Sequence, residues 1–173
     1  MADEKGLDLF VVVGEKSGDA LAKEVLSPLF KKHSIGGVLG PDLRELGAKE
    51  FFPMEALQIN GFGSLITKGL SAIQFFFKVR KSILAKKPKA VLLVDNAEFS
   101  LLMAHSLRKK GFKGKIIQLV APSIWAWRGS RKKTLETHYD YLLSIFPFEE
   151  ELFSHSPLPV SYIGHPLVEK ILK

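Results

Sequence analysis

Short, continuous runs of apolar residues recur along this chain, and each run is cut off by a residue that ends a strand. They cover residues Leu7–Val13, Ile35–Leu39, Lys89–Val94 and Lys115–Val120. A run that is mostly apolar, rather than alternating, predicts a strand buried on both faces, as in a parallel sheet. Stretches with apolar residues at helical spacing separate the runs. This alternation predicts an α/β fold with a doubly wound, Rossmann-like sheet of six or seven mostly parallel strands.

The remaining elements are shorter. Phe51–Phe52, ahead of Pro53, predicts a brief edge strand. The other expected elements are a helical turn, three helices and two strands, at Asp42–Leu46, Ala20–Lys32, Glu98–Lys110, Ser130–His138, Tyr141–Ile145 and Val160–Ile163, with a short helix opening at Pro147. We expect residues 1–173 to form a single domain, the usual expectation for this length.

Composition narrows the class of protein. The net charge of +7 suggests an anionic partner: nucleic acid, anionic lipid or a phosphorylated ligand. The sequence has no zinc finger, aromatic RNA-binding signature or basic zipper, so we expect no nucleic acid. With no cysteine, no signal-peptide pattern and no apolar window near the ~18 residues of a spanning helix, a cytoplasmic protein is expected.

A glycine-containing loop, Gly14–Asp19, joins the first strand to the first helix. Glycines allow backbone to approach a ligand, and a new helix offers free N–H groups to an anion. Gly14, Glu15, Ser17, Gly18 and Asp19 are therefore candidate binding residues. The alternative is local capping, with Ser17 or Asp19 as the helix N-cap.

Two carboxylates follow the clearest strand of the chain. Asp95 and Glu98 come directly after Val94, so they face the edge of a parallel sheet where ligands bind. Asp95 is the candidate general base. Glu98 also suits the first turn of the following helix, where the dipole favours an acidic side chain.

Both tryptophans, Trp125 and Trp127, lie in the segment after the next strand. Pro122 ends that strand, which places Ser123, Trp127 and Arg128 at the same edge of the sheet. The segment forms either a wall of a ligand site or a cap on the core.

Residues Gly61–Lys87 are unusually apolar for one amphipathic helix. One stripe at helical spacing comprises Phe62, Leu65, Ile66, Leu70, Ile73, Phe76, Phe77, Ile83 and Leu84, while Ile59, Ala72, Phe75 and Val79 lie off it. Lysines and arginines fringe the helix. It is either a core helix or a membrane-surface contact through Ile59, Phe62, Leu65, Ile66 and Phe75.

Six segments together resemble the N-terminal half of lipid A disaccharide synthase, an inverting glycosyltransferase of the two-domain GT-B fold. They are Gly14–Asp19, Gly36–Pro41, Val94–Phe99, Pro122–Arg128, Pro147–Glu149 and Gly164–Pro166. The resemblance implies transfer of 2,3-diacylglucosamine from UDP to 2,3-diacylglucosamine 1-phosphate, in lipid A biosynthesis on the cytoplasmic face of the Gram-negative inner membrane. It implies no metal or other cofactor, a peripheral membrane contact, and a C-terminal domain holding most of the UDP site; a homodimer stays open.

By the same resemblance, Asp95 takes the proton of the acceptor's 6-hydroxyl, while Glu15, Ser17 and Asp19 line the acceptor cleft and Ser123, Trp127 and Arg128 shape it. The chain departs from the family pattern at Asn96–Ser100, where a proline and an aspartate are replaced, and at Gln118–Leu119, where a histidine–tyrosine pair is usual. These departures indicate a divergent member of the family. Because the second domain, which the resemblance implies holds most of the UDP site, is absent from the 173 residues, we expect no transfer by them alone. The alternatives are a catalytically idle lipid-binding or membrane-docking domain, or a flavodoxin-like phospholigand-binding domain.

Overall fold

The computed structural model describes residues 6–59, 69–122 and 129–164. In these residues seven strands form one sheet in the order β3-β2-β1-β4-β5-β6-β7, and every neighbouring pair is parallel. The strands are β1 Leu9–Val13, β2 Ile35–Leu39, β3 Lys49–Pro53, β4 Ala90–Val94, β5 Lys115–Leu119, β6 Tyr141–Ser144 and β7 Val160–Tyr162. The predicted Rossmann-like α/β fold is confirmed.

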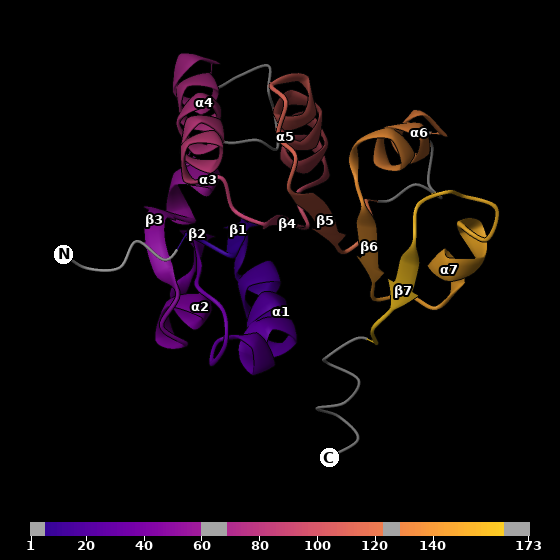
Figure 1. The fold of residues 1–173 in the computed structure, drawn as a ribbon, viewed down its shortest axis with the longest axis horizontal. Coiled ribbons are helices and arrows are strands. Elements are labelled where there is room, and N and C mark those ends of the chain that lie inside the picture. The colour runs from indigo at the N-terminus through magenta and orange to yellow at the C-terminus, as the bar shows by residue number, and fades with distance from the viewer. Residues whose placement is uncertain (1–5, 60–68, 123–128, 165–173) are drawn as a thin grey trace.

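Helices cover the two faces of the sheet unequally. The helix α1 (Lys16–Leu26) and the short α2 (Pro41–Glu45) lie on one side, and α4 (Gly69–Lys86), α5 (Ala97–Lys109) and α6 (Gly129–His138) lie on the other (Figure 1). The chain steps in one direction from β1 to β3 and in the opposite direction from β4 to β7, so right-handed crossovers place the two groups on opposite faces. The remaining short helices are 3₁₀ Ser27–Leu29, α3 Glu55–Ile59 and α7 Phe148–Leu152, the last of which contacts β7.

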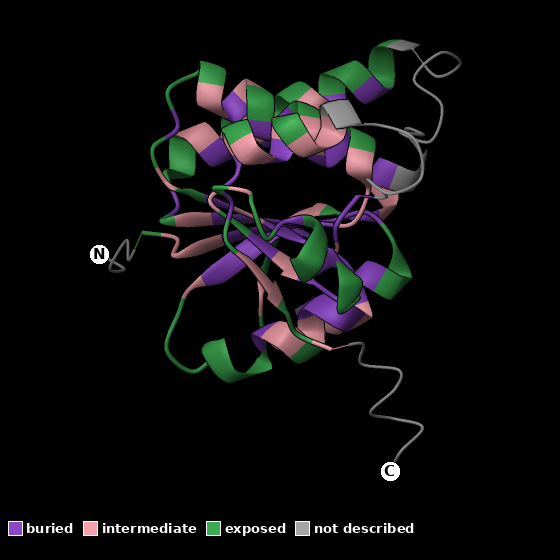
Figure 2. Ribbon diagram, turned by 90° about the vertical axis from the view of Figure 1, so that its right-hand side faces the viewer, coloured by how far each residue is buried: buried purple, intermediate pink, exposed green. Residues whose placement is uncertain are grey.

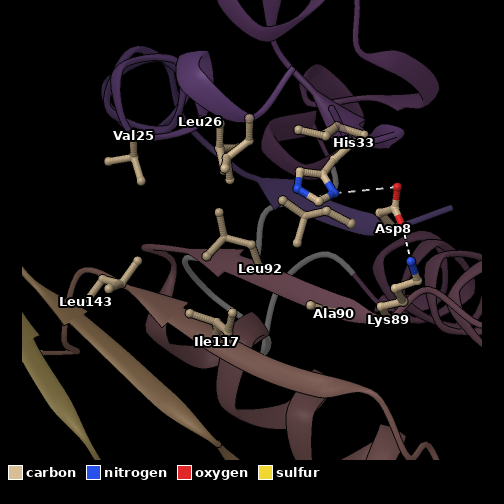
Figure 3. A pocket seen from close by; sticks show the side chains of 12 residues that line it. Asp8, Val25, Leu26, His33, Lys89, Ala90, Leu92, Ile117 and Leu143 are labelled. Carbon is tan, nitrogen blue, oxygen red and sulfur yellow. Dashed lines mark ion pairs between the residues drawn. The ribbon is translucent and has the colours of Figure 1, made fainter. Parts of the chain in front are cut away.

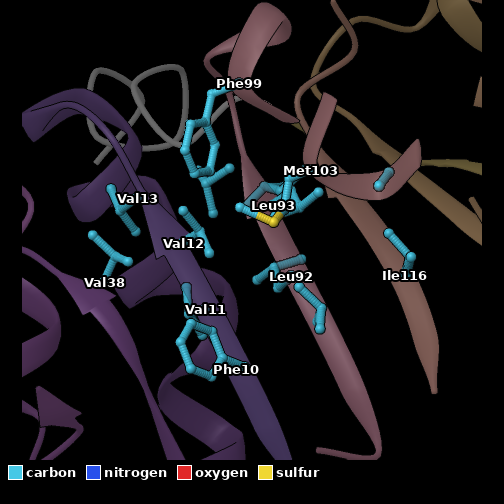
Figure 4. Close-up of a cluster of buried hydrophobic side chains, with 14 of the residues drawn as sticks. Phe10, Val11, Val12, Val13, Val38, Leu92, Leu93, Phe99, Met103 and Ile116 are labelled. Atoms are coloured by element: carbon cyan, nitrogen blue, oxygen red, sulfur yellow. The ribbon is translucent and has the colours of Figure 1, made fainter. Parts of the chain in front are cut away.

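The core lies in the centre of the sheet and on the helix faces turned toward it. Buried residues are concentrated there (Figure 2), and all five residues of β2 are buried. Phe99 and Met103 of α5 lie over Leu93 of β4, and both are at most 1% exposed (Figure 4). The apolar runs that became β1, β2 and β4 are therefore strands covered on both sides, whereas β5 is covered less completely.

The face that α4 turns to the sheet coincides with the predicted stripe only in part, since Ile83 of the stripe is buried and Phe76 packs edge-on against Phe99, with ring centroids 5.6 Å apart. Its buried residues are Ala72, Phe75, Val79 and Ile83, while Leu70, Ile73 and Phe77 are exposed. Phe75 packs edge-on against Phe52 of β3, with ring centroids 5.7 Å apart. The prediction of Phe75 as a membrane-contact residue is wrong, because its side chain belongs to the core.

Candidate functional site at the carboxyl edge of the sheet

The loops after β1 and β4 meet at the point where the strand order reverses. The chain goes from β1 outward to β2 and β3 on one side, and returns to β4 on the other. In open α/β sheets the crevice at this switch point, outside the carboxyl ends of the strands, binds ligands. Gly14 follows β1 and lies against Asn96: a Cβ at position 14 would come within 3.0 Å of Asn96 Nδ2. The loops after β1 and β4 are therefore in close contact at this point.

Strained backbone marks the same edge. Asp95 and Asn96, directly after β4, have φ of 50° and 41°, and Val120, directly after β5, has φ of 70°. Left-handed conformations at residues other than glycine cost on the order of 1–3 kcal/mol each, and they cluster at ligand-binding and catalytic sites. The Asn96 side chain offsets part of this free-energy cost, because it caps α5 by accepting a hydrogen bond from Phe99 N at 3.4 Å.

The main chain of Asp95 is held by three contacts. Its N–H donates to Leu119 O (2.9 Å), and its carbonyl accepts from Ser100 Oγ (2.8 Å) and from Gln118 Nε2 (3.3 Å). The Asp95 carboxylate is half-buried and has no hydrogen bond or ion pair within the described part of the chain. A fixed backbone carrying a free carboxylate is the arrangement expected of a base that must meet a bound hydroxyl.

The start of α1 lies beside this carboxylate's strand. Gly18 of α1 packs against Val94, the residue before Asp95: a Cβ at position 18 would be 3.1 Å from Val94 Cγ1. Glu15 occupies the N-cap position of α1 without a side-chain capping bond, and Glu15 and Ser17 are both exposed. Glu98 is exposed in the first turn of α5. These side chains are therefore accessible at the carboxyl edge.

Asp19 has a structural position, and the prediction that it binds sugar hydroxyls is wrong. Its side chain is fully buried, and its two oxygens accept hydrogen bonds from Gly40 N (3.1 Å) and Asp42 N (2.7 Å). Burial raises the pKa of this carboxyl, although the main-chain N–H groups oppose the rise. Asp19 fixes the loop between β2 and α2. It is also not the N-cap of α1, since the helix begins three residues earlier at Lys16.

Glu149, in the last but one of the segments that carry the resemblance, is likewise structural. It is 2% exposed and accepts a hydrogen bond from the Ser144 hydroxyl at the end of β6. Burial raises the pKa of Glu149, and the bond from Ser144 opposes that rise.

Several predicted residues lie outside the described part of the chain. They are Ser123, Trp127 and Arg128 at the candidate site, and Phe62, Leu65 and Ile66 among the membrane contacts; the side chain of Ile59 is also not described. Their roles stay predictions.

Gln118 is the residue that sequence reasoning undervalued. It is 1% exposed, and its Nε2 reaches Asp95 O on one strand end and Val120 O (3.0 Å) on the other. The signals were one uncharged polar residue inside the apolar run of β5 and the departure from the family pattern at the same position. A buried amide in a strand must find partners, so it points to a bracing role between strand ends.

Residues 6–59, 69–122 and 129–164 contain no group of three or more histidine, aspartate or glutamate side chains arranged to hold a metal ion. In the same ranges no helix has the length and apolar character needed to cross a bilayer.

The strand order and the switch-point site define a Rossmann-like ligand-binding domain of the kind found in GT-B glycosyltransferases. The family model for lipid-A-disaccharide synthetase matches residues 9–173, and the chain belongs to this family.

Curated relatives extend the match. The lipid-A-disaccharide synthase of Chlamydia pneumoniae is 42% identical over 165 residues, covering 94% of this chain and 27% of the relative. That of Chlamydia muridarum is 44% identical over 168 residues, with the same coverage. That of Rhodospirillum centenum is 34% identical over 169 residues, covering 95% of this chain and 42% of the relative. The chain thus spans about a quarter of the Chlamydia relatives' length.

Proposed function

We propose that this chain is the acceptor-side domain of a lipid A disaccharide synthase. The observation that carries the proposal is the Asp95 carboxylate, which has no partner among the described residues and lies at the switch point on a main chain fixed by Leu119, Ser100 and Gln118. Family membership supplies the class of reaction, and the position of Asp95 supplies the group that an inverting transfer needs.

The reaction assigns a role to each group. Asp95 accepts the proton of the acceptor's 6-hydroxyl while that oxygen forms a bond to the anomeric carbon of the donor. The bond between this carbon and the phosphate oxygen breaks, and UDP leaves with the electron pair. Glu15 and Ser17, exposed beside Asp95's strand, bind hydroxyls of 2,3-diacylglucosamine 1-phosphate. The donor is the UDP-linked 2,3-diacylglucosamine.

The donor nucleotide requires more protein than this chain provides. In the two-domain arrangement a second, C-terminal domain binds UDP, and the 173 residues alone do not catalyse transfer. Measurable disaccharide formation by this chain without a second domain would contradict this part of the proposal.

The test of Asp95 is a substitution in the protein that contains both domains. Asp95→Asn keeps the shape of the side chain but removes the base, so the rate of disaccharide formation falls by about 10²–10⁴. The matched control is Glu24→Gln, which removes one carboxylate from an exposed position of α1 far along the helix from Gly14. A rate that Asp95→Asn leaves unchanged would remove Asp95 from the role.

An exposed apolar patch supports peripheral contact with the inner membrane. Leu70, Ile73 and Phe77 of α4 are 77%, 47% and 47% exposed, and Leu102 of the neighbouring α5 is 45% exposed. The Arg80 guanidinium lies 4.6 Å from the centre of the Phe77 ring, and Lys78 and Lys81 add charge nearby. Apolar side chains ringed by cations suit the interface of an anionic bilayer.

Co-sedimentation with anionic vesicles tests this contact. Phe77→Asp places a charge in the centre of the patch and weakens binding several-fold. Leu152→Asp makes the same kind of change at a residue 42% exposed on α7, away from α4, and serves as the control. Equal loss for both variants, or none, argues against the patch.

Among the alternatives, the flavodoxin-like domain is wrong. A flavodoxin sheet has the order 2-1-3-4-5, in which the third strand adjoins the first, whereas here β3 lies outside β2 and β4 adjoins β1. The idle lipid-binding domain stays an outcome of the tests: vesicle binding through α4, with no transfer by the complete protein.

A further inference from the structure

An apolar groove lies between α1 and the sheet. Its volume is about 320 Å³. Val25 of α1 lies on one side of it, and the sheet residues Leu92, Ile117 and Leu143 lie on the other (Figure 3). Val25, Ile117 and Leu143 are partly exposed. A groove of this volume, lined by apolar side chains that solvent reaches, favours an apolar ligand.

The groove has the dimensions of one acyl chain. It crosses β1, β4, β5 and β6, from Leu9 to Leu143, and three spacings of about 4.8 Å between strands give a length of about 14 Å. Its volume is at the lower end of the roughly 300–1,000 Å³ of small-molecule sites. A single chain of medium length suits these dimensions.

One end of the groove carries charged side chains. Lys89 Nζ lies 2.7 Å from Asp8 Oδ1, and His33 Nδ1 lies 3.7 Å from Asp8 Oδ2 (Figure 3). Asp8 Oδ2 also accepts a hydrogen bond from Ser34 N at 3.0 Å. The bond from Lys89 holds the pKa of Asp8 well below its usual range. The negative charge of Asp8 is therefore already compensated.

A second pocket, which we call the cationic pocket, adjoins this end of the groove. Three lysines, Lys32, Lys87 and Lys89, and one carboxylate, that of Asp8, contribute to its lining. Asp8 and Lys89 also line the groove, so the two spaces are continuous in their walls. Since Lys89 compensates Asp8, Lys32 and Lys87 leave an excess of positive charge. Within the described residues neither of them pairs with a carboxylate.

Lys87 is an unusual residue for its position. It directly follows α4 and has φ of 45°, a left-handed conformation that glycine adopts more readily after a helix. The charge that suits the end of a helix is already supplied by Lys86, whose Nζ lies 3.9 Å from the centre of the Phe51 ring. Lys87 therefore adds a further charge to the cationic pocket at some cost in backbone strain.

We propose that the groove and the cationic pocket together bind an amphiphile with one acyl chain and a phosphate headgroup. The chain lies against Ile117 and Leu143. The phosphate contacts Lys32, Lys87 and Lys89, because ammonium groups are common partners of phosphate. An apolar groove that ends among uncompensated cations matches both parts of such a ligand.

This site is separate from the candidate site at Asp95. Asp8 precedes β1 and Lys89 precedes β4, so the cationic pocket lies at the amino edge of the sheet. A strand of five residues such as β4 is about 16 Å long, and Asp95 follows its other end. The proposal therefore does not rest on the proposed function.

Calorimetric titration of the 173-residue chain with lauroyl lysophosphatidate tests the site. The ligand is kept below the concentration at which it forms micelles. We expect saturable binding that is about tenfold tighter than that of monolauroyl glycerol, which lacks the phosphate, and of inorganic phosphate, which lacks the chain.

Lys32→Gln combined with Lys87→Gly tests the headgroup contacts. Glycine relieves the strained φ at position 87, so the fold is not weakened there. We expect the affinity for lauroyl lysophosphatidate to fall about tenfold. Lys109→Gln combined with Lys110→Gln removes the same charge from two exposed residues of the end of α5, on the other face of the sheet, and should leave the affinity unchanged.

Val25→Phe tests the chain contacts, since the larger ring fills the groove and should abolish binding. Leu102→Phe is the control, because it enlarges an exposed side chain of α5 on the other face. Phe77→Asp, in the exposed patch of α4, should also leave the affinity unchanged and separates this site from the membrane contact.

Every result decides the proposal. Binding that needs both chain and phosphate, and that both site variants weaken, supports it. The proposal is overturned if lauroyl lysophosphatidate does not bind, or if inorganic phosphate or monolauroyl glycerol binds equally well. It is also overturned if either site variant leaves the affinity unchanged or if a control lowers it as much. Circular dichroism of each variant establishes that the fold is retained.

Discussion

The side chain of Gln118 joins Asp95 to the neighbouring strand. Its Nε2 lies 3.3 Å from Asp95 O and 3.0 Å from Val120 O, so one buried amide braces two residues with positive φ. Gln118 Oε1 is buried without a partner among the described residues. A buried amide with an unpaired oxygen is costly, so its N–H hydrogen bonds must be important to the structure. We infer that they fix the strand ends that carry the candidate base.

Replacing this amide should loosen the edge. Gln118→Met keeps the length of the side chain but removes the donor, leaving the carbonyls of Asp95, Leu119 and Val120 without it. Each bond contributes about 0.5–1.5 kcal/mol, and removal of the unpaired Oε1 offsets part of the loss, so the free energy of unfolding should fall by about 1 kcal/mol. Urea denaturation measures it. Gln74→Met, the same change at an exposed position of α4, should shift it by less than about 0.5 kcal/mol.

Gly40 should not tolerate a side chain, because the buried carboxylate of Asp19 occupies the space that a Cβ would need. A Cβ at position 40 would stand 2.3 Å from Asp19 Oδ2 and 2.6 Å from Met54 Sδ, both of which are buried. Gly40→Ala must displace the carboxylate from the N–H groups that hold it, so we expect a loss of about 2–3 kcal/mol or more. Gly6→Ala, where a Cβ meets nothing within 4 Å, is the control. Equal unfolding midpoints for the two variants would contradict this prediction and show that the loop around Asp19 can rearrange at little cost in free energy.

The strands, and the gathering of their following loops at one edge, were predictable because they depend on local patterns. A short apolar run such as Ile35–Leu39, ended by glycine and proline, favours a strand covered on both faces, and the loops after parallel strands gather at one edge. The role of Asp19 was not predictable, since its partners Gly40 and Asp42 lie more than twenty residues away, as the separations of 21 and 23 show.

The prediction of which face of α4 packs on the sheet failed for a different reason. The helix is apolar on two sides, with Ala72 and Val79 on one and Leu70 and Phe77 on the other. Helical periodicity gives the spacing of a stripe, but it does not select which of two stripes faces the sheet. Only the packing of Phe75 against Phe52 decides that.

Replacing Arg108 with lysine should reduce the stability of the fold. Its guanidinium donates to His138 O (3.0 Å), Phe112 O (3.0 Å) and Gly114 O (2.9 Å), and it pairs with Asp140. These contacts tie the end of α5 to the loop before β5 and to the end of α6. A lysine ammonium cannot span the same set of acceptors, so Arg108→Lys should reduce the free energy of unfolding by about 2 kcal/mol.

The comparison for Arg108 is Lys109→Arg, the reverse exchange at the next, exposed position of α5. Thermal unfolding of both variants measures the difference. Since Asp140 loses one of its two cationic partners in Arg108→Lys and keeps Lys115, a double variant with Asp140→Asn should lose less than the sum of the two single losses. Additive losses would show that the pair acts through separate contacts.

His138 should make the junction of α5 and α6 sensitive to acid. Burial lowers the pKa of His138 below 6.5, and the neighbouring His105 and Arg108 lower it further by charge repulsion. His138 Nε2 lies 3.1 Å from His105 Nδ1, a contact that one shared proton satisfies and two protonated rings would break. The unfolded chain therefore takes up a proton at a higher pH than the folded one. Stability is present in full above pH 6.5 and declines as the pH falls below it.

The unfolding midpoint in urea, measured across pH 6.5, tests this dependence. His138→Gln removes the titrating ring and should flatten the decline on the acid side. His155→Gln changes an exposed histidine outside this junction and should leave the decline as it is in the parent chain. If the unfolding midpoint of His138→Gln declined with pH as steeply as that of the parent chain, the acid sensitivity would belong to other groups. A histidine whose pKa is the same in the folded and unfolded chain does not make stability depend on pH.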